Sequence, residues 1–218
     1  MLVLPVDAAA RQDAIADHLT SCRVAGLCRP GDRIVELVAR ESALLPLLLR
    51  RGTHPHSLTV VHGTTPGSAA DRADNGLPFP VTRRRSDPAG AWPVAGPVDL
   101  VVDTSAAYST ASVLRTVGNA ADLLTLGGRL VLSSSATSTD LPAVLQNAGF
   151  TIDEVHGVEL PDSDEQVERV LLDRFGRDAI ALYRTIRLEC EPEFARPVIA
   201  TSLGDDAATV LQICRRTR

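Results

Sequence analysis

The chain has 218 residues and a formal net charge of −5 at pH 7, with 44% hydrophobic and 22% charged residues. This length and composition are those of a soluble globular protein with one α/β domain, and the charge argues against broad binding to a nucleic-acid phosphate backbone. All 22 basic residues are arginines, which excludes catalysis by a Schiff-base lysine or a lysine general base.

The first predicted element is a helix over residues 7–27, where apolar residues recur at helical spacing before a turn at 31–32. A buried strand at 34–38 follows. A leucine-rich helix at 43–50 then ends before Gly52. Together these pieces form a strand, a tight turn and a helix, the unit on which many α/β proteins bind a nucleotide.

Strands and helices continue to alternate along the next hundred residues. The sequence predicts strands at 57–61 and 79–83 with only a weak helix around 68–72 between them, then a strand at 98–102, a helix at 112–124, a glycine turn and strand at 127–135, a helix at 140–147 and a strand at 151–155. Continuous apolar strands indicate a sheet that is covered on both faces. We therefore predict an α/β fold with a doubly wound, mostly parallel sheet.

Beyond residue 160 the pattern changes to amphipathic helical stretches at 162–175 and 178–188, before a final strand at 209–214. A helical insertion before the last strand is the simplest account, and such insertions often cover a site. We expect a single domain over 1–218, made of a leading helix (1–30), a Rossmann-like core (31–160), a helical insertion or lid (161–206) and a terminal strand (207–218).

Four phrases carry a resemblance to a known family: GDRIVEL, VDLVVDTSAAY, LLTLGGRLVL and LPAVLQNAGFTIDEV. Their order and spacing resemble those of the class I Rossmann-like S-adenosylmethionine-dependent methyltransferases, across roughly residues 8–160 and again at the terminal strand. The resemblance implies a mostly parallel, seven-stranded sheet of methyltransferase type and S-adenosylmethionine as cofactor. The alternative is another doubly wound enzyme for a nucleotide sugar or a dinucleotide.

The cofactor turn departs from the family pattern. Family members carry a turn resembling E-x-G-x-G-x-G, whose glycines let the backbone approach the cofactor and take positive φ. Glu36 is in place, but Val38, Arg40 and Ser42 stand at the three glycine positions. A β-branched Val38 cannot cheaply take such dihedral angles, and Arg40 would project towards the space of the amino acid part of the cofactor. If the turn has been rebuilt instead, Arg40 contacts the cofactor carboxylate.

The end of the second strand departs from the pattern as well. The family places Asp or Glu there to accept hydrogen bonds from the ribose hydroxyls, whereas this chain has His62. A neutral imidazole offers one acceptor and cannot replace the paired acceptors of a carboxylate. Asp87 stands where the family often uses an acid near adenine, although it could equally cap a turn before Pro88. We therefore expect conventional S-adenosylmethionine binding to be weak or absent.

Three residues are candidates for acid–base chemistry. Asp103, after the fourth core strand, could act as a base or orient a substrate hydroxyl, or else cap the next helix. Tyr108 in the same loop could cover a ring or donate a proton. His156, at the end of the sixth core strand, is the third candidate, with an ordinary exposed histidine as its alternative. Glu154 and Asp153 precede His156, but neighbouring strand residues point to opposite faces, so no dyad is expected.

Other polar groups suggest no metal centre. His54 and His56 should lie at the opposite end of their strand from His62, and the four cysteines lack metal-ligand spacing. We expect reduced thiols, a cytoplasmic location, no metal and no membrane or nucleic-acid partner. The run of arginines at 83–85 is expected to be a solvated strand end rather than an anion site.

These observations favour a small-molecule enzyme on the methyltransferase fold, diverged at the cofactor turn, with cyclisation or rearrangement as its chemistry. An active methyltransferase with a rebuilt turn is the closest alternative. A third hypothesis is a non-catalytic subunit of a heteromeric complex, and the sequence also leaves a homodimer open.

Overall fold

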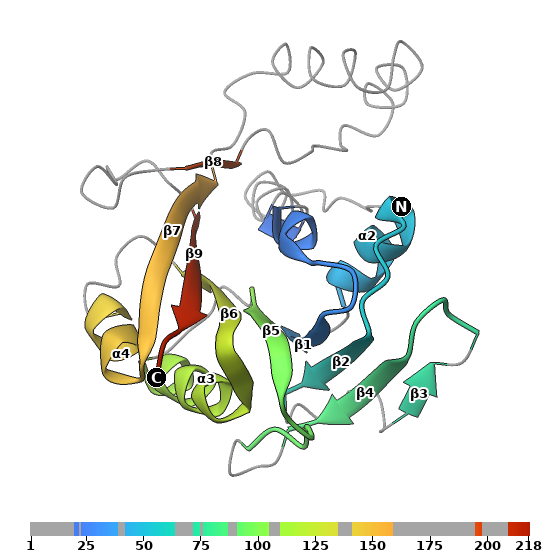
Figure 1. The fold of residues 1–218 in the computed structure, drawn as a ribbon, viewed down its shortest axis with the longest axis horizontal. Helices are drawn as coiled ribbons and strands as arrows, with labels where there is room; N and C mark the ends of the chain where they lie inside the picture. The colour runs from blue at the N-terminus through green and yellow to red at the C-terminus, as the bar shows by residue number, and fades with distance from the viewer. Residues whose placement is uncertain are drawn as a thin grey trace, which may run out of the picture.

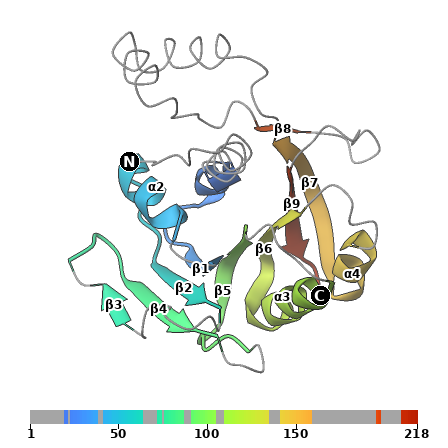
Figure 2. The same ribbon diagram turned by 180° about the vertical axis from the view of Figure 1, so that it is seen from behind.

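The computed structural model of the chain describes residues 20–21, 23–38, 42–63, 72–74, 76–86, 91–104, 110–134, 141–158, 195–197 and 209–218. Within these ranges the strands form one sheet, with helices packed on both of its faces (Figures 1 and 2). Among the described residues, no helix combines the length and the apolar character needed to cross a membrane.

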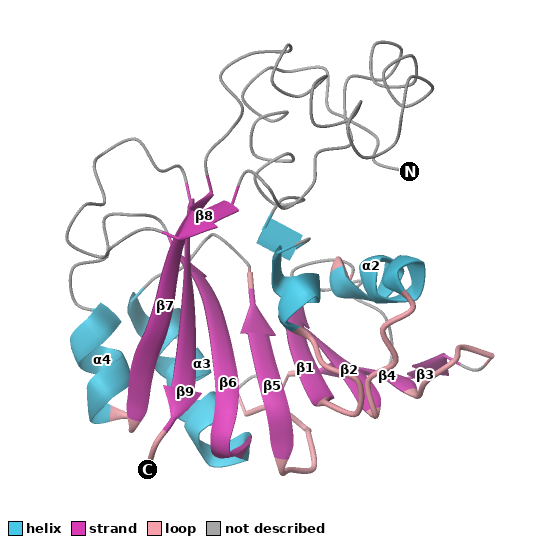
Figure 3. Cartoon of the chain, turned by 45° about the horizontal axis from the view of Figure 1, so that its top comes forward, coloured by secondary structure: helices cyan, strands magenta, loops and turns pink. Residues whose placement is uncertain are grey.

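Seven strands form the main body of the sheet, in the spatial order β4-β2-β1-β5-β6-β9-β7. Their bounds are β1 (Arg33–Val38), β2 (Ser57–His62), β4 (Val81–Arg85), β5 (Val98–Asp103), β6 (Leu124–Ser134), β7 (Phe150–Val158) and β9 (Thr209–Arg216). Only β9 runs antiparallel to its neighbours in this body, between β6 and β7 (Figure 3). The doubly wound, mostly parallel sheet predicted from the sequence is therefore confirmed.

Two short antiparallel strands extend this body, which brings the described sheet to nine strands. β3 (Arg72–Asp74) pairs with β4 at one edge, and β8 (Ala195–Pro197) pairs with β7 at the other. The prediction of a weak helix around residues 68–72 is wrong at its last residue, which belongs to β3. A three-residue edge strand is too short to show the alternation by which a strand is identified in a sequence.

The helices divide between the two faces of the sheet. A helix at 20–27, in which residue 22 is not described, and α2 (Leu44–Arg51) cover one face (Figure 1). α3 (Thr110–Leu123) and α4 (Leu141–Asn147) cover the other. Each face has its own core of aliphatic side chains, as the continuous apolar strands predicted. The core under α2 includes Leu44 and Leu48, and the core under α3 includes Val117 and Ala120.

Glycines with left-handed backbone conformation end two of the helices. Gly52 follows α2 with φ of 64°, and its N–H donates to the carbonyls of Leu48 and Leu49. Gly149 lies between α4 and β7 with φ of 87°, and a Cβ there would stand 2.9 Å from the carbonyl oxygen of Arg218. A glycine is thus required at residue 149, because this turn packs closely against Arg218.

The predicted strand and helix positions agree with the structure to within a few residues at most boundaries. β6 is the exception, because it begins at Leu124 and includes the glycine pair, with an irregular register opposite β5. The first part of the leading helix and the predicted helices at 162–175 and 178–188 lie outside the described residues.

Candidate functional site

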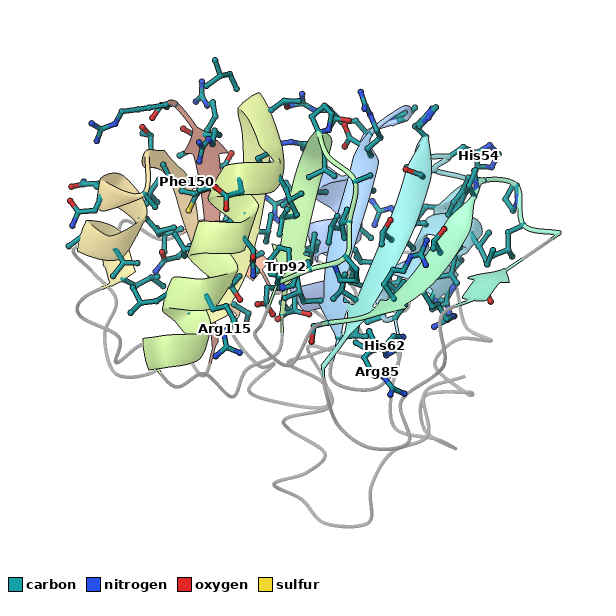
Figure 4. All side chains as sticks on the ribbon, turned by 90° about the horizontal axis from the view of Figure 1, so that it is seen from below. His54, His62, Arg85, Trp92, Arg115 and Phe150 are labelled. Carbon is teal, nitrogen blue, oxygen red and sulfur yellow. The ribbon has the colours of Figure 1, made fainter. Side chains whose placement is uncertain are left out.

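The carboxyl ends of the parallel strands meet at one edge of the sheet, which is where ligands of doubly wound folds bind. Figure 4 shows His62 and Arg85 at this edge and His54 at the opposite end of the sheet. The predicted separation of His54 from His62 is therefore confirmed. In the described residues, no group of three or more His, Cys, Asp or Glu side chains is arranged to hold a metal ion.

Glu36 is buried near the end of β1, and its carboxylate is occupied by the start of the next helix. Its Oε1 accepts hydrogen bonds from the backbone N–H groups of Ala43 and Leu44, each at 3.1 Å. The hydroxyl of Ser42 donates a short hydrogen bond to Oε2. The same Ser42 oxygen accepts the N–H of Leu45 at 2.9 Å, so Ser42 and Glu36 together cap α2.

Burial has an electrostatic cost at this carboxylate. It raises the pKa of Glu36 from 4.5 to about 7, although the hydrogen bonds from Ser42, Leu44 and Ala43 and the charge of Arg83 oppose the rise. The sequence identified Glu36 as a cofactor-binding residue, and in the structure its carboxylate caps α2. The signal for this role in the sequence is the serine just before the leucine-rich helix.

Val38 and His62 are adjacent at the ends of their strands. They are partners in the parallel register of β1 and β2, and His62 is also opposite Arg85 of β4. Val38 is half-buried and packs against the core under α2, while the His62 imidazole is buried. The backbone carbonyl of His62 accepts the N–H of Ser86 at 2.9 Å. An aliphatic side chain and an imidazole thus stand where the family resemblance implies a glycine and a carboxylate.

Asp103 ends β5 and is buried between the main strands. Its neighbours in register are Leu37 of β1 and Leu132 of β6. Its Oδ2 accepts a hydrogen bond from the hydroxyl of Thr116 at 2.9 Å, so the side chain is tied to the second turn of α3. Asp103 is therefore at the expected edge of the sheet, with one carboxylate oxygen holding the helix that follows.

His156 lies near the carboxyl end of β7 and is only 1% exposed. Its Nε2 lies 2.6 Å from Oε2 of Glu154 and 3.4 Å from Nη2 of Arg23, which comes from the helix at 20–27. Arg23 and Glu154 are themselves 3.8 Å apart. Three side chains from two elements thus form one polar cluster at the same edge as Asp103, as the parallel strand directions require.

Two expectations about these residues are corrected. His156 is a buried residue rather than an ordinary exposed one. Glu154 and His156 do form a pair, since residues two apart in a strand share a face, and the register with β9 shifts between Ile152 and Glu154. The expectation that Asp153 does not pair with His156 is confirmed, since the Asp153 carboxylate pairs with Arg215 of β9 at 2.7 Å. It overlooked the i, i+2 spacing of Glu154 and His156.

The arginine run at the end of β4 is also less solvated than expected. The Nε of Arg83 donates to Oδ2 of Asp74 at 2.9 Å, and the Arg83 side chain is 13% exposed. This pair was missed because Asp74 belongs to β3, which the sequence did not predict. Arg85 is exposed.

Two described cysteines, Cys28 and Cys214, are buried free thiols. Burial raises the pKa of each to about 12, which keeps the thiols protonated and unreactive. Both thiols belong to the packed core. Of the other candidate site residues, Arg40, Asp87 and Tyr108 lie outside the described residues.

No protein-family model and no curated protein matches the sequence. Solved structures do match over nearly the whole chain. One is in the complex between the Trm112 methyltransferase activator of Haloferax volcanii and its methyltransferase, with a TM-score of 0.58 and 16% identity over 96% of this chain and 94% of that one.

Two further matches differ in chemistry. The magnesium protoporphyrin IX methyltransferase ChlM of Synechocystis, with S-adenosylmethionine bound, has a TM-score of 0.55 and 12% identity over 98% of this chain and 86% of that one. The [4+2]-cyclase SpnF has a TM-score of 0.52 and 14% identity over 99% of this chain and 86% of that one. At such identities the likeness is one of fold, and this chain has the fold of the class I S-adenosylmethionine-dependent methyltransferases.

Proposed function

We propose that this chain is a methyltransferase-fold enzyme that acts on a small molecule at the carboxyl edge of its sheet, without conventional binding of S-adenosylmethionine. The observation that carries the proposal is the use of Glu36 as an internal cap. Its carboxylate is bonded by Ser42, Ala43 and Leu44, so a ligand at this turn would have to compete with the helix itself.

The neighbouring positions support the same conclusion. Val38 packs against the core where a glycine would leave room for the cofactor, and His62 is buried where a carboxylate would accept two ribose hydroxyls. Each missing hydrogen bond to a buried ligand group costs about 1–3 kcal/mol. Two or three such losses weaken a micromolar ligand to millimolar affinity or beyond, since every 1.4 kcal/mol is about tenfold.

The chemistry proposed for this site is acid–base catalysis of a cyclisation or rearrangement. Asp103 and His156 are buried carboxyl and imidazole groups near the edge at which the substrate would bind, and Tyr108 follows five residues after Asp103 in the sequence. The cyclase among the structural matches supports this choice, because it uses the same fold for a reaction that is not named as methyl transfer.

Isothermal titration calorimetry with S-adenosylmethionine tests the proposal. The Synechocystis methyltransferase, which holds S-adenosylmethionine in its structure, is the positive control under the same conditions. We expect no heat of binding from this chain at cofactor concentrations that saturate the control. One-to-one binding with micromolar affinity would overturn the proposal.

An active methyltransferase with a rebuilt turn is the second candidate, supported by the bound cofactor in the Synechocystis structure. In this case Arg40 holds the cofactor carboxylate, and Arg40→Ala abolishes binding. Binding and turnover that survive this substitution would remove Arg40 from that role. Arg50→Ala is a matched control, since Arg50 is an exposed arginine of α2.

A non-catalytic subunit of a heteromeric complex is the third candidate, supported by the Haloferax match, which is in a complex with an activator protein. Size-exclusion chromatography with light scattering, on the chain alone and after affinity capture from its native cell, separates this candidate from the others. A lone monomer that converts a metabolite would eliminate it. We also propose a cytoplasmic location, which the buried free thiols of Cys28 and Cys214 support.

A further inference from the structure

The start of α2 contains hydrogen bonds that meet at one carboxylate and one hydroxyl. Ser42 donates its hydroxyl proton to Oε2 of Glu36, and the same Ser42 oxygen accepts the N–H of Leu45 at 2.9 Å. Oε1 of Glu36 accepts the N–H groups of Ala43 and Leu44, each at 3.1 Å. Glu36 is 1% exposed, whereas Ser42 is only half-buried. The turn therefore joins a buried ionisable group to a hydroxyl that reaches the surface.

These bonds determine where a proton can be added to Glu36. Oε1 faces two N–H donors, so a proton on this oxygen would point at another donor. Oε2 faces the Ser42 hydroxyl, whose oxygen has two lone pairs and uses one of them for the N–H of Leu45. The second lone pair can accept from a protonated Oε2 if the hydroxyl hydrogen turns away. Proton uptake thus reverses the bond between Ser42 and Glu36 and keeps the bonds to the three backbone N–H groups.

Glu36 takes up this proton near neutral pH, because burial raises its pKa to about 7. The ionised form is favoured instead by the hydrogen bonds of the turn, with that from Ser42 as the largest opposing effect, and by the charge of Arg83 on β4. Arg83 remains a cation throughout this range. A small change in pH therefore changes the dominant form of Glu36.

Other groups face Glu36 from the elements packed around it. Its strand partners are Val60 of β2 and Val102 of β5, which do not titrate, and α2 contributes leucines. Cys28 follows the helix at 20–27, and its thiol stays neutral because burial raises its pKa to about 12. His62 lies two residues after Val60 on the same face, and histidines ionise near neutral pH. A test must therefore separate His62 from Glu36.

We propose that Glu36 and Ser42 form a pH-sensitive switch at the start of α2. When Glu36 is ionised, the Ser42 hydroxyl donates inward to the carboxylate. When Glu36 is neutral, its carboxyl group donates to Ser42, and the hydroxyl hydrogen turns outward as a donor for an acceptor group at the carboxyl edge of the sheet. The proton comes from solvent, and only hydrogen bonds change. The switch goes beyond the proposed function and does not depend on it, since all of its groups belong to the fold.

A pH titration of the backbone amide signals by NMR tests the switch in the protein alone. The N–H signals of Ala43 and Leu44 should move downfield together as the pH rises, with a midpoint at about 7, because an ionised carboxylate is the stronger acceptor. The N–H of Ala148, which donates to the carbonyl of Val144 in α4, should not titrate.

Two variants assign the titrating group. Glu36→Gln should abolish the titration of the Ala43 and Leu44 signals, and His62→Gln should leave it in place. A titration that persists in Glu36→Gln, or that disappears in His62→Gln, would overturn the switch. The absence of any titration near neutral pH in the parent protein would overturn it as well.

Variants of Ser42 test the part that the hydroxyl plays. Ser42→Ala removes the donor that favours the ionised carboxylate, so the midpoint should rise by about one pH unit, as for the loss of a hydrogen bond to a charged group. Ser42→Thr keeps the hydroxyl and should retain the parent midpoint. Equal midpoints in Ser42→Ala and the parent protein would remove the hydroxyl from the switch and overturn the proposal.

Hydrogen exchange at Leu45 separates turning of the hydroxyl from unwinding of the helix. The Ser42 oxygen accepts the N–H of Leu45 in both forms of the switch. Protection of this amide, corrected for the intrinsic pH dependence of exchange, should therefore be equal on the two sides of the midpoint. Loss of protection on the acidic side would mean that the first turn of α2 opens instead, and it would overturn the reversal of the bond between Ser42 and Glu36.

Discussion

Oε1 of Glu36 lies 3.1 Å from the backbone nitrogen of Leu44, so a strand residue caps the helix that follows it. The positive end of the α2 dipole and three donors stabilise the ionised carboxylate, yet burial outweighs them and raises its pKa to about 7. Near neutral pH this group is therefore divided between its charged and neutral forms.

Glu36 should make folding stability depend on pH. The pKa of Glu36 is about 7 in the folded protein against an ordinary value of 4.5, so the folded state holds the proton more tightly. The resulting stabilisation is fully present below about pH 4.5 and is lost as the pH rises through about 7. The loss is on the order of 3 kcal/mol, at 1.36 kcal/mol per pKa unit. Denaturant unfolding at a series of pH values measures it.

Glu36→Gln is the control, since glutamine keeps the shape and does not titrate. The difference in unfolding free energy between the parent and Glu36→Gln should fall steadily across this window and become constant above it. A difference that is independent of pH would show that the carboxylate is as well solvated in the folded state as in the unfolded state.

Ser42 should be important for stability rather than for a ligand. Ser42→Ala removes its hydrogen bond to Glu36 and the cap on the N–H of Leu45. We expect a loss of about 1–2 kcal/mol in denaturant unfolding, as for other helix caps. Ser42→Thr keeps the hydroxyl and should recover most of the loss. Equal losses in the two variants would assign the effect to the backbone instead of the hydroxyl.

Much of the fold could be predicted from the sequence because it depends on local patterns. Apolar runs identified the seven main strands, and Gly149, with φ of 87°, forms the turn between α4 and β7. The glycine pair at 127–128, which was predicted to form a turn, lies within β6 instead. β3 was missed because three residues at a sheet edge carry no periodic signal. Arg83 was expected to be solvated, and its ion pair was missed for the same reason, since its partner Asp74 belongs to β3.

The site was less predictable because its side chains contact residues that are distant from them in the sequence. The sequence identified Asp103 and His156 as residues at the carboxyl edge, but not what holds them. Thr116 is 13 residues from Asp103, and Arg23 is 133 residues from His156. Only Glu154, two residues before His156, could have been found from strand periodicity.

The ion pair of Asp32 and Arg129 should be a major contributor to stability at the amino edge of the sheet. Nη2 of Arg129 lies 2.6 Å from Oδ2 of Asp32, and the two side chains are 14% and 11% exposed. The second Arg129 nitrogen, Nη1, donates to the carbonyl of Leu27. Removal of one partner leaves a nearly buried charge, which costs about 3–5 kcal/mol. Arg129→Met should lower the melting temperature by roughly 10 °C in calorimetry.

The double variant Asp32→Asn/Arg129→Met should lose less than the sum of the single variants, because no charge is left unpaired. Arg33→Ala is the surface control, since Arg33 and Asp99 are 3.6 Å apart and their side chains are 46% and 32% exposed. It should change stability by no more than about 0.5 kcal/mol. Additive losses in the double variant would mean that the two side chains do not interact in solution.

The last prediction concerns the cofactor turn, in the triple variant Val38→Gly, Arg40→Gly and His62→Asp. The glycines restore the room and backbone freedom that a close cofactor approach requires, and the aspartate restores paired ribose acceptors. Ser42 is retained, because a third glycine would remove the cap of α2. If these residues are what excludes S-adenosylmethionine, its affinity should rise by at least about tenfold, or roughly 1.4 kcal/mol, in calorimetry.

Stability should fall in this triple variant, because Val38 packs against the core and the new carboxylate at residue 62 is buried until a ligand arrives. Binding must therefore be measured well below the melting temperature, with an unchanged circular dichroism spectrum. The single variant Arg40→Gly separates the causes: it should give most of the gain if the arginine side chain is the main obstruction, and little if the ribose acceptors matter more. A folded triple variant with no gain would mean that features which these substitutions leave in place, among them the cap that Glu36 and Ser42 form on α2, are enough to exclude the cofactor.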